Sequence, residues 1–355
     1  MKSSFNILRL LLAMGVGFIL WPGCKEDYSL PKAMVFVANE ESGSISVLDA
    51  VYFTKWNEID LTESGESPVL VHNVQVAPDG KSVWATVIPG GAHQHGGAME
   101  EIIVMDPFSS KIMARIEVGA GLHLAHVVLD DACEYAYATA TDSNQVLEIN
   151  ARNYQVTRRF NLGSGHSPHG LRYFGGKLFI ANLDAKSLSI LHIATGEQTE
   201  VALGGVAVQT AVLPDGKFAF ASLYDTKELV RYDLASGALL RISLPAGSLG
   251  PIQLYPSPDS KQVFVCDQGG LNSQPWSDKV YIIDVETAQI SGTIAVGSGA
   301  HGVVISHDGL YAFVTNTNDD SVSVIEIASQ KVVSTLTVGE RPNGIGYWYR
   351  GGGMP

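Results

Sequence analysis

Histidines are the residues of this chain that are best suited to chemistry, and most of them are closely paired. The sequence has 355 residues and ten histidines, six of which form the pairs His93 and His95, His123 and His126, and His166 and His169. Neutral imidazole is a strong ligand for zinc, copper and nickel. The His-Gln-His spacing of the first pair puts two rings on one side of an extended segment. A metal site is therefore the first hypothesis, provided that the fold brings distant histidines together.

A repeated phrase predicts how distant residues meet. An apolar run ending in Asn occurs three times, as Phe36-Val37-Ala38-Asn39, Phe179-Ile180-Ala181-Asn182 and Phe313-Val314-Thr315-Asn316. A polar loop and an alternating strand follow each copy. Repetition with a period of about 40 residues indicates a stack of similar supersecondary units. We expect the three asparagines to be structural parts of that unit.

The repeat predicts an all-β fold. Helical periodicity is almost absent, and turn signals such as Pro78-Asp79-Gly80 separate short alternating strands. The best-preserved unit, residues 301–340, contains four strands, which together with the period predicts a seven-bladed β-propeller over residues 33–349. Residues 33–64 lack a first strand, and residues 342–349 supply one. We expect the ring to close by this pairing, with a Gly-rich tail at 350–355.

The propeller gathers the histidines at one end of its axis. His72, His126, His169 and His301 fall at the start of the innermost strand of four blades, where the other three carry Gln209, Gln253 and Asn343. His123 and His166 lie three residues earlier, and an insertion at residues 89–100 adds His93, His95 and the soft donor Met99. We predict a copper or zinc site at the channel mouth formed by several of His72, His93, His95, His123, His126, His166, His169 and His301. His192 and His307 are expected at the surface.

Two other interpretations of the histidines stay open. They can line a polar pocket for a small ligand without a metal, or they can only bind channel waters and satisfy strand ends. Four aspartates, Asp142, Asp184, Asp225 and Asp267, follow the second strand of their blades and are expected to be turn formers, with a role as ligand or base as the alternative. A second insertion, residues 267–279, carries Trp276, which either stacks on a ligand or anchors its loop.

The repeat phrases resemble those of the YVTN-type β-propeller family, within the wider group that shares its fold with the nitrous oxide reductase propeller. The resemblance covers roughly residues 33–349. It implies a fold and leaves the function open. In the nitrous oxide reductase propeller, histidines at the top of the ring hold a copper cluster, which is similar to the arrangement expected here. The present chain has no cupredoxin domain with its Cys and Met ligands, so the resemblance does not extend to electron delivery.

The N-terminus reads as a targeting segment. Lys2 and Arg9 precede an apolar run, residues 10–21, which is short for a membrane span, and Gly23-Cys24 follows. We expect a lipoprotein signal peptide at 1–23, lipid on Cys24 and a tether at 24–32. An ordinary secretory signal and a plain membrane anchor are the alternatives. Residues 25–27 (Lys-Glu-Asp) resemble a surface-export signal of Bacteroidota lipoproteins. The expected location is the cell envelope, anchored to the outer membrane on its periplasmic or outer side.

Charge and cysteine content limit the remaining partners. The formal net charge of −13 and the absence of a basic cluster exclude nucleic acid as a partner, and we expect a monomer. Cys133 and Cys266 are expected as two buried free thiols, with a disulfide as the alternative. No Cys-x-x-Cys-His segment for covalent haem and no Gly-x-Ser-x-Gly elbow occurs.

Three functions fit these residues. The first is metal binding at the channel mouth, with redox chemistry left open. The second is a hydrolase or lyase for lactone-like or sugar-derived substrates, in which a channel-mouth His is the general base and an acid such as Asp142 or Asp184 is its partner or a ligand of a divalent ion. The third is a surface scaffold that binds a protein or polysaccharide through the loop at 267–279.

Overall fold

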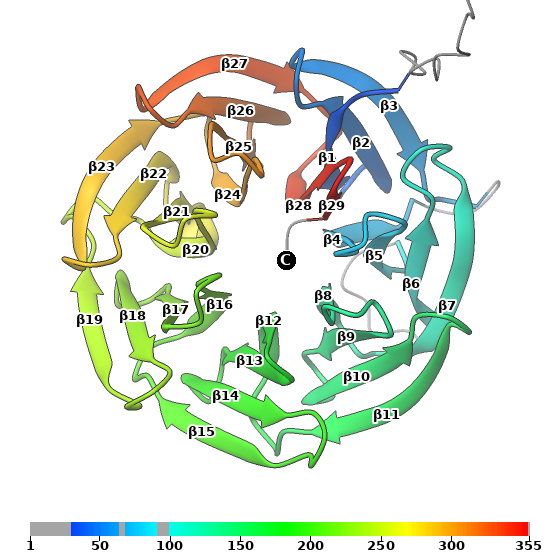
Figure 1. Ribbon diagram of the computed structural model, residues 1–355, viewed down its shortest axis with the longest axis horizontal. Coiled ribbons are helices and arrows are strands. Elements are labelled where there is room, and N and C mark those ends of the chain that lie inside the picture. The colour runs from blue at the N-terminus through cyan, green and yellow to red at the C-terminus, as the bar shows by residue number, and fades with distance from the viewer. Residues whose placement is uncertain (1–29, 64–67, 91–98, 354–355) are drawn as a thin grey trace, which may run out of the picture. The chain divides into compact units, whose positions relative to one another are not determined.

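Seven antiparallel sheets surround a central axis in the computed structural model of the chain (Figure 1). The model describes residues 30–63, 68–90 and 99–353, which include a single short helical turn, η1 (Leu271–Ser273). Six of the sheets have four strands and the seventh has five. The predicted seven-bladed propeller is thereby confirmed. Within the described residues, no helix is both long enough and apolar enough to cross a membrane.

Each blade is named here after its inner strand, which comes first in the following series. The blades are β4 (Leu70–Val76), β5 (Val83–Ile88), β6 (Met99–Met105) and β7 (Ile112–Ala120); β8 (Leu124–Leu129), β9 (Tyr135–Ala140), β10 (Gln145–Asn150) and β11 (Gln155–Asn161); β12 (Pro168–Phe174), β13 (Lys177–Asn182), β14 (Ser187–His192) and β15 (Gln198–Ala202); β16 (Ala207–Val212), β17 (Phe218–Leu223), β18 (Glu228–Asp233) and β19 (Leu239–Ser243); β20 (Pro251–Pro256), β21 (Gln262–Gly269), β22 (Trp276–Asp284) and β23 (Gln289–Ala295); β24 (Ala300–Ile305), β25 (Tyr311–Asn316), β26 (Ser321–Glu326) and β27 (Lys331–Thr337); and β28 (Pro342–Tyr349), β1 (Ala33–Asn39), β2 (Ser44–Asp49) and β3 (Thr54–Asp60).

The β28 blade joins strands from the two ends of the chain. Strand β1 pairs with β2 on one side and with β28 on the other, and Val35 lies opposite Tyr347. The indole Nε1 of Trp348 also donates to the carbonyl of Gly80, at 2.8 Å, in the next blade. A fifth strand, β29 (Gly352–Gly353), pairs with the inner edge of β28 (Figure 1). Part of the expected Gly-rich tail therefore belongs to this sheet.

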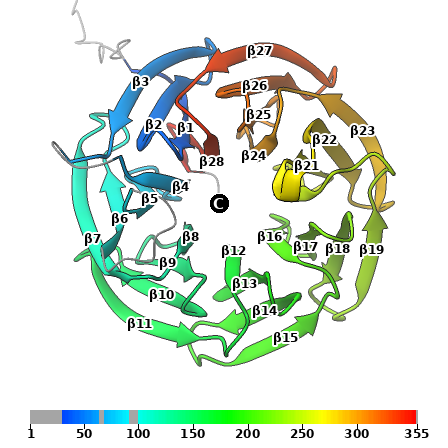
Figure 2. The same cartoon turned by 180° about the vertical axis from the view of Figure 1, so that it is seen from behind.

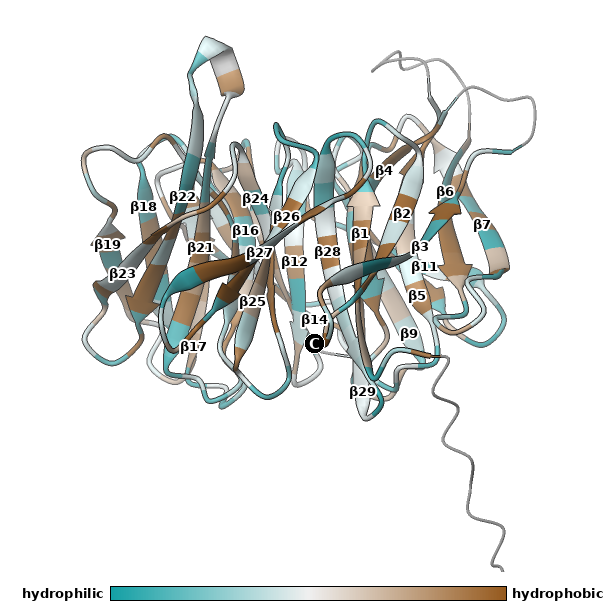
Figure 3. Cartoon of the chain, turned by 90° about the horizontal axis from the view of Figure 1, so that it is seen from above, coloured by the Kyte–Doolittle hydropathy of each residue, from teal (hydrophilic) through white to brown (hydrophobic). Residues whose placement is uncertain are grey.

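Burial follows the position of a strand in its blade. The second strands are almost wholly buried because each blade is covered by a neighbour on both faces, and the repeat phenylalanines Phe36, Phe179 and Phe313 are at most 1% exposed. The outer strands are largely exposed, and in β27 every second residue is exposed. Figure 3 shows the resulting apolar band across the strands and the β21–β22 hairpin that projects from one face of the ring.

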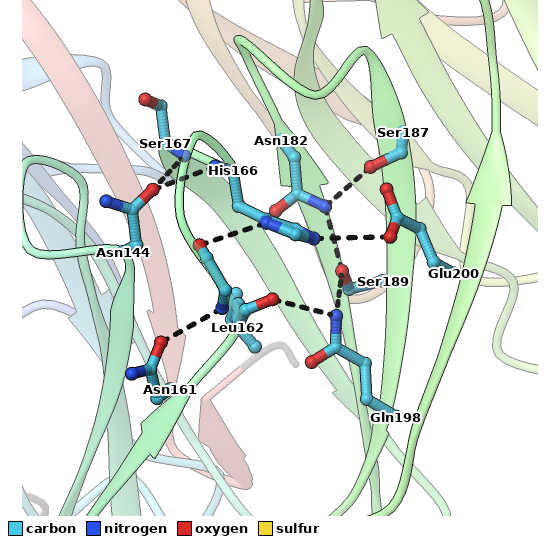
Figure 4. A network of polar contacts seen from close by, with 11 residues as sticks. Asn144, Asn161, Leu162, His166, Ser167, Asn182, Ser187, Ser189, Gln198 and Glu200 are labelled. Atoms are coloured by element: carbon cyan, nitrogen blue, oxygen red, sulfur yellow. Dashed lines mark hydrogen bonds and ion pairs between the residues drawn. The ribbon is translucent and has the colours of Figure 1, made fainter.

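The repeat asparagines are structural, as predicted. The amide nitrogen of Asn182 donates to Ser187 and Ser189 on the next strand, at 2.9 and 2.8 Å (Figure 4). Asn39 and Asn316 hold serine pairs at equivalent places, Ser44 with Ser46 and Ser321 with Ser323. Each asparagine thus fastens the second strand of its blade to the third.

Every inner strand contains an irregularity near its start. In β12, Pro168 pairs with Asn182 and Leu171 with Ile180, so His169 and Gly170 together oppose one residue, Ala181. Such an extra residue is a β-bulge, which bends the strand and redirects side chains. The register shifts at the corresponding place in all seven blades.

Buried hydroxyls connect these bulges around the ring. Thr139 accepts the backbone N–H of His126 in its own blade, at 3.0 Å, and donates to the carbonyl of His169 in the next blade, at 2.6 Å. Thr86, Ser222 and Thr315 make the same pair of contacts. Aligned by these contacts and the pairing, the first bulge positions are His72, Ala125, His169, Val208, Ile252, His301 and Asn343, and the second are Asn73, His126, Gly170, Gln209, Gln253, Gly302 and Gly344.

Glycine at a second bulge position lets neighbouring inner strands approach closely. A Cβ on Gly344 would lie 2.6 Å from the Cα of Asn73 in the next blade. We expect Gly344→Ala to lower the free energy of unfolding by about 1–3 kcal/mol, because backbone has to shift to admit the methyl group. Urea denaturation measures this change. Gly247→Ala is the matched control, since nothing lies within 4 Å of its Cβ. Equal stabilities of the two variants would contradict this account of the packing.

Candidate metal centre

Three histidines from three consecutive blades converge at the channel mouth. His72, His126 and His169 each offer a ring nitrogen, and these nitrogens all lie within 4.8 Å of one another. The ring centroids are 5.1 to 5.8 Å apart. A tetrahedral zinc ion bound at about 2.1 Å holds its nitrogens about 3.4 Å apart. Inward movements of less than about 1 Å would bring the three rings, here called the histidine triad, to that geometry.

A carboxylate holds the first ring of the triad. His72 Nδ1 lies 2.9 Å from Oε1 of Glu40, and the amide of Asn343 donates to the other carboxylate oxygen at 3.0 Å. Burial would raise the pKa of Glu40, but His72 and Asn343 outweigh it and lower the pKa to about 2. Because an ionised Glu40 accepts the Nδ1 proton, the Nε2 atom of His72 keeps its lone pair. Carboxylates commonly hold metal-bound histidines in this way.

Two further histidines are fixed in the same tautomer. His169 Nδ1 donates to the carbonyl of Val208 at 3.0 Å, in a blade where Ala181 supplies no hydroxyl for that carbonyl. His301 Nδ1 lies 2.7 Å from Oε1 of Gln268. In each case the partner leaves Nε2 as the acceptor. His301 lies in the same ring of residues but outside the triad.

His126 has the opposite preference. Gln209 accepts the N–H of Thr210 with its side-chain oxygen, at 2.8 Å, so its amide nitrogen faces His126 Nδ1 at 3.3 Å. A nitrogen that accepts from this amide leaves the proton on Nε2. Coordination through Nε2 of His126 therefore requires the Gln209 amide to turn.

Burial keeps the inner histidines neutral. Desolvation, with the neighbouring imidazoles, lowers the pKa of His169 and of His301 to about 3, and it lowers the pKa of His126 well below its ordinary value. Neutral imidazoles bind a metal ion without first losing a proton. At neutral pH, none of these three rings therefore has to lose a positive charge before a cation could bind.

Polar atoms without partners collect at the same place. Of the six buried side-chain nitrogens and oxygens that lack a hydrogen bond within the described residues, four belong to the mouth, namely His72 Nε2, His126 Nε2, Gln253 Nε2 and Asn343 Oδ1. Buried polar groups are nearly always satisfied in folded proteins. A water, ion or ligand is the expected partner of such atoms.

The structure places the other predicted ligands apart from the triad or outside the described residues. His93 and His95 lie outside the described residues. His166 Nδ1 lies 3.0 Å from the carbonyl oxygen of Gly163, and its Nε2 lies 3.3 Å from Oε2 of Glu200 on the outer strand β15 (Figure 4). His166 is thereby engaged at the rim of its blade. His123 has a backbone φ of 53° in the connection that leads into β8. Met99 is 44% exposed at the start of β6.

Acidic residues that the sequence hypothesis did not select position the mouth. Glu100 accepts the backbone N–H groups of Leu122, His123 and Leu124, at 2.7 to 2.9 Å, and so fixes the start of β8 two residues before His126. Glu40 is the other example. A carboxylate that accepts three backbone N–H groups holds the chain in place at this point.

Three of the aspartates that follow the second strands, Asp184, Asp225 and Asp267, accept hydrogen bonds from the connection that leads into the inner strand of their own blade, and not from a local turn as expected. Asp267 is buried and accepts from Ser248, Gly250 and Ser277. Ser167 donates to Asp184 at 2.6 Å. Asp225 accepts the N–H of Val206 and pairs with Lys186.

Other side chains singled out in the sequence also have structural surroundings. Trp276 is the first residue of β22, which forms the projecting hairpin with β21 (Figures 2 and 3). The guanidinium carbon of Arg341 lies 5.1 Å from the centroid of the Trp276 ring. This contact favours the loop-anchoring role. Cys133 and Cys266 are both free thiols, as expected, although only Cys266 is fully buried. His307 is exposed, as expected, and its ring stacks on that of Tyr349 with the centroids 4.2 Å apart.

Comparisons with known proteins support the fold. No family model and no curated protein matches the chain. Among solved structures, it resembles a functionally unknown protein from Desulfotomaculum acetoxidans, with a TM-score of 0.70 and 15% identity over 89% of this chain and 99% of that one. It also resembles Kuenenia stuttgartiensis hydrazine synthase, with a TM-score of 0.66 and 13% identity over 83% and 97%. A streptogramin B lyase matches with a TM-score of 0.64 and 14% identity over 80% and 91%. At these identities the likeness shows the propeller alone.

The buried neutral histidines predict an acid-sensitive fold. In the unfolded chain, histidines gain a proton near pH 6.5, whereas His126, His169 and His301 stay neutral in the folded protein. The unfolded state therefore binds more protons below pH 6.5, and the free energy of unfolding falls as the pH falls. We expect each of the three to remove about 2 kcal/mol between pH 7 and pH 5. Urea denaturation of chelator-treated protein at both pH values measures the loss.

A variant without these imidazoles is the control for that measurement. The triple substitution His126→Gln, His169→Gln and His301→Gln should remove most of the pH dependence in this range. A wild-type free energy of unfolding that is the same at pH 7 and pH 5 would contradict the neutral, buried state of the three rings.

Proposed function

We propose that this protein binds one transition-metal ion, copper or zinc, at the mouth of its propeller channel through His72, His126 and His169. The observation that carries the proposal is the convergence of three ring nitrogens within 4.8 Å, two of them on the histidines whose buried Nε2 atoms have no partner in the described residues. An ion at this point satisfies both atoms. Imidazole donors suit zinc and copper better than magnesium or calcium.

The surroundings of the triad support binding at neutral pH. The pKa values of His126 and His169 lie below their ordinary value, so protons do not compete with the metal. Glu40 and Val208 hold the Nδ1 protons of His72 and His169, which aims the Nε2 atoms. His301 is a candidate fourth ligand from across the channel. With three protein ligands, one coordination position stays open to water or substrate, as at catalytic zinc sites.

The ion would supply Lewis-acid chemistry if it is zinc, and it would add one-electron chemistry if it is copper. The chain's own residues hold the ligands in place and shield them from bulk water. Glu40 keeps the lone pair of His72 available, and Gln209 decides the tautomer of His126. Whether the protein is an enzyme depends on what reaches the open position.

The proposed location is the bacterial cell envelope. Its support is the sequence at Gly23-Cys24, after an apolar segment with a positive start. Lipid on Cys24 would anchor the propeller to the outer membrane as a monomer. The metal site then lies outside the cytoplasm, where copper and zinc are taken up and exchanged.

Metal content tests the function. Untagged protein that has been purified and dialysed against Cu²⁺ or Zn²⁺ should hold about one equivalent of the metal, as measured by elemental mass spectrometry. Glu40→Gln should weaken binding about 10- to 100-fold, because the group that holds a metal-bound histidine typically contributes this much. Glu41→Gln is the matched control, since Glu41 is an exposed neighbour that pairs with Arg341.

Two outcomes would overturn the proposal. The first is less than about a tenth of an equivalent of either metal in the dialysed wild type. The second is unchanged affinity after His126→Ala and His169→Ala together, since both rings are required by the geometry. Thermal unfolding of the variants distinguishes loss of a ligand from loss of the fold.

A second function is favoured by the Glu40–His72 pair. A buried carboxylate that orients an imidazole at 2.9 Å is also the arrangement of a general base. The streptogramin B lyase is named as a lyase and has the same fold, which makes a lyase or hydrolase reaction the class to test. Lactone-like and sugar-derived substrates are the proposed panel. Activity that survives chelation but disappears in His72→Gln would favour this function over metal binding.

A further inference from the structure

Below the histidines, the channel has a second layer of residues. These lie two positions after the second bulge position of each inner strand, and they are Gln75, Val128, Arg172, Ala211, Tyr255, Val304 and Gly346. Only Arg172 carries a charge. The other members are apolar or small, apart from one amide and one phenol. A single guanidinium therefore stands in the wall of an otherwise uncharged layer.

Arg172 has no carboxylate partner among the described residues. Its Nη1 donates to the carbonyl of Leu171 at 2.9 Å, and its guanidinium carbon lies 6.0 Å from the ring centroid of Tyr255. Within the described residues, no carboxylate lies within 4 Å of it, whereas most other arginines have such a partner. Burial lowers the pKa of Arg172, because desolvation disfavours the charged guanidinium.

The guanidinium lies in the channel. Arg172 belongs to β12 and Tyr255 to β20, and the β16 blade separates these strands around the ring, so their contact crosses the channel. Arg172 is only half-buried, so solvent reaches it there. A guanidinium has five donors, and most of those of Arg172 have no partner in the described residues.

The bulge of β12 puts Arg172 on the same side as the metal ligand His169. In a regular strand, residues three apart face opposite sides, but the extra residue at Gly170 restores the match. Their Cα atoms are separated by about 10 Å along the strand at about 3.3 Å per residue. Arg172 is also among the charges that lower the pKa of His126.

We infer that the channel holds a small carboxylate or oxyanion between Arg172 and the metal at the histidine triad. The metal side of this site rests on the proposed function, whereas the other side depends only on Arg172. An anion removes two unfavourable situations at once, the guanidinium without a carboxylate partner in the described residues and the positive charge that remains on a metal held by three neutral imidazoles with the Glu40 carboxylate behind them. The planar fork of Arg matches the paired oxygens of a carboxylate. The inference assigns an anionic substrate class to the open coordination position.

Formate titration of the copper-loaded protein tests the site. The visible absorption band of bound Cu²⁺ should shift and saturate as formate is added. Arg172→Met should weaken formate binding at least about tenfold while leaving the copper content unchanged, since a hydrogen bond between charged groups contributes a factor of this order. Arg172→Lys should bind with intermediate affinity, because it keeps the charge and loses the fork. Arg152→Met is the control, since Arg152 is an exposed residue paired with Glu134.

The outcomes separate this inference from the proposed function. Equal formate affinity in wild type, Arg172→Met and Arg172→Lys would overturn the inference while leaving the metal site intact. If the wild type takes up neither copper nor zinc, the proposed function fails. The part of the site at Arg172 is then tested in metal-free protein by NMR, through the width of the ¹³C signal of labelled formate. Broadening that disappears in Arg172→Met supports the site, and identical lines in both proteins overturn it.

Discussion

The β-bulge at the start of each inner strand is the constraint on which the site depends. A regular strand beside the axis would send alternate side chains into the two neighbouring blades. Because two residues oppose one at this point, the strand bends, and a side chain such as His169 is turned toward the axis. Buried hydroxyls fix the geometry, since Thr139 holds the bulge of its own blade and the carbonyl of His169 in the next. The histidines meet because these distortions share one height around the ring.

The repeat phrases in the sequence were sufficient to predict the fold. Phe179 and Asn182 recur because one fills the space between blades and the other ties two strands together, so both leave a visible pattern. The ring of histidines was predicted to within one residue. The sequence did not reveal that His126 occupies the second bulge position whereas His72 and His169 occupy the first. The pattern of apolar residues does not distinguish these two positions.

Other parts of the site left no pattern in the sequence. Glu40 lies in a polar loop after a repeat phrase, and only the closed ring brings it to His72 and Asn343. Arg172 stands in an apolar strand where a long amphipathic side chain is unremarkable. His166 matched the spacing of His123 but is held by Gly163 and Glu200. Hydrogen-bond partners of single residues decide such details, and repeats carry no information about them.

The pairing that closes the ring also determines when the mouth can be complete. Asn343 donates to Glu40 across 303 positions of the sequence, and Glu40 in turn holds His72. During synthesis, the ribosome must therefore release nearly the whole polypeptide before the surroundings of one of its earliest histidines exist. A nascent or truncated chain has imidazoles but no enclosure for them, so the proposed uptake of a cation would be a property of the finished molecule alone.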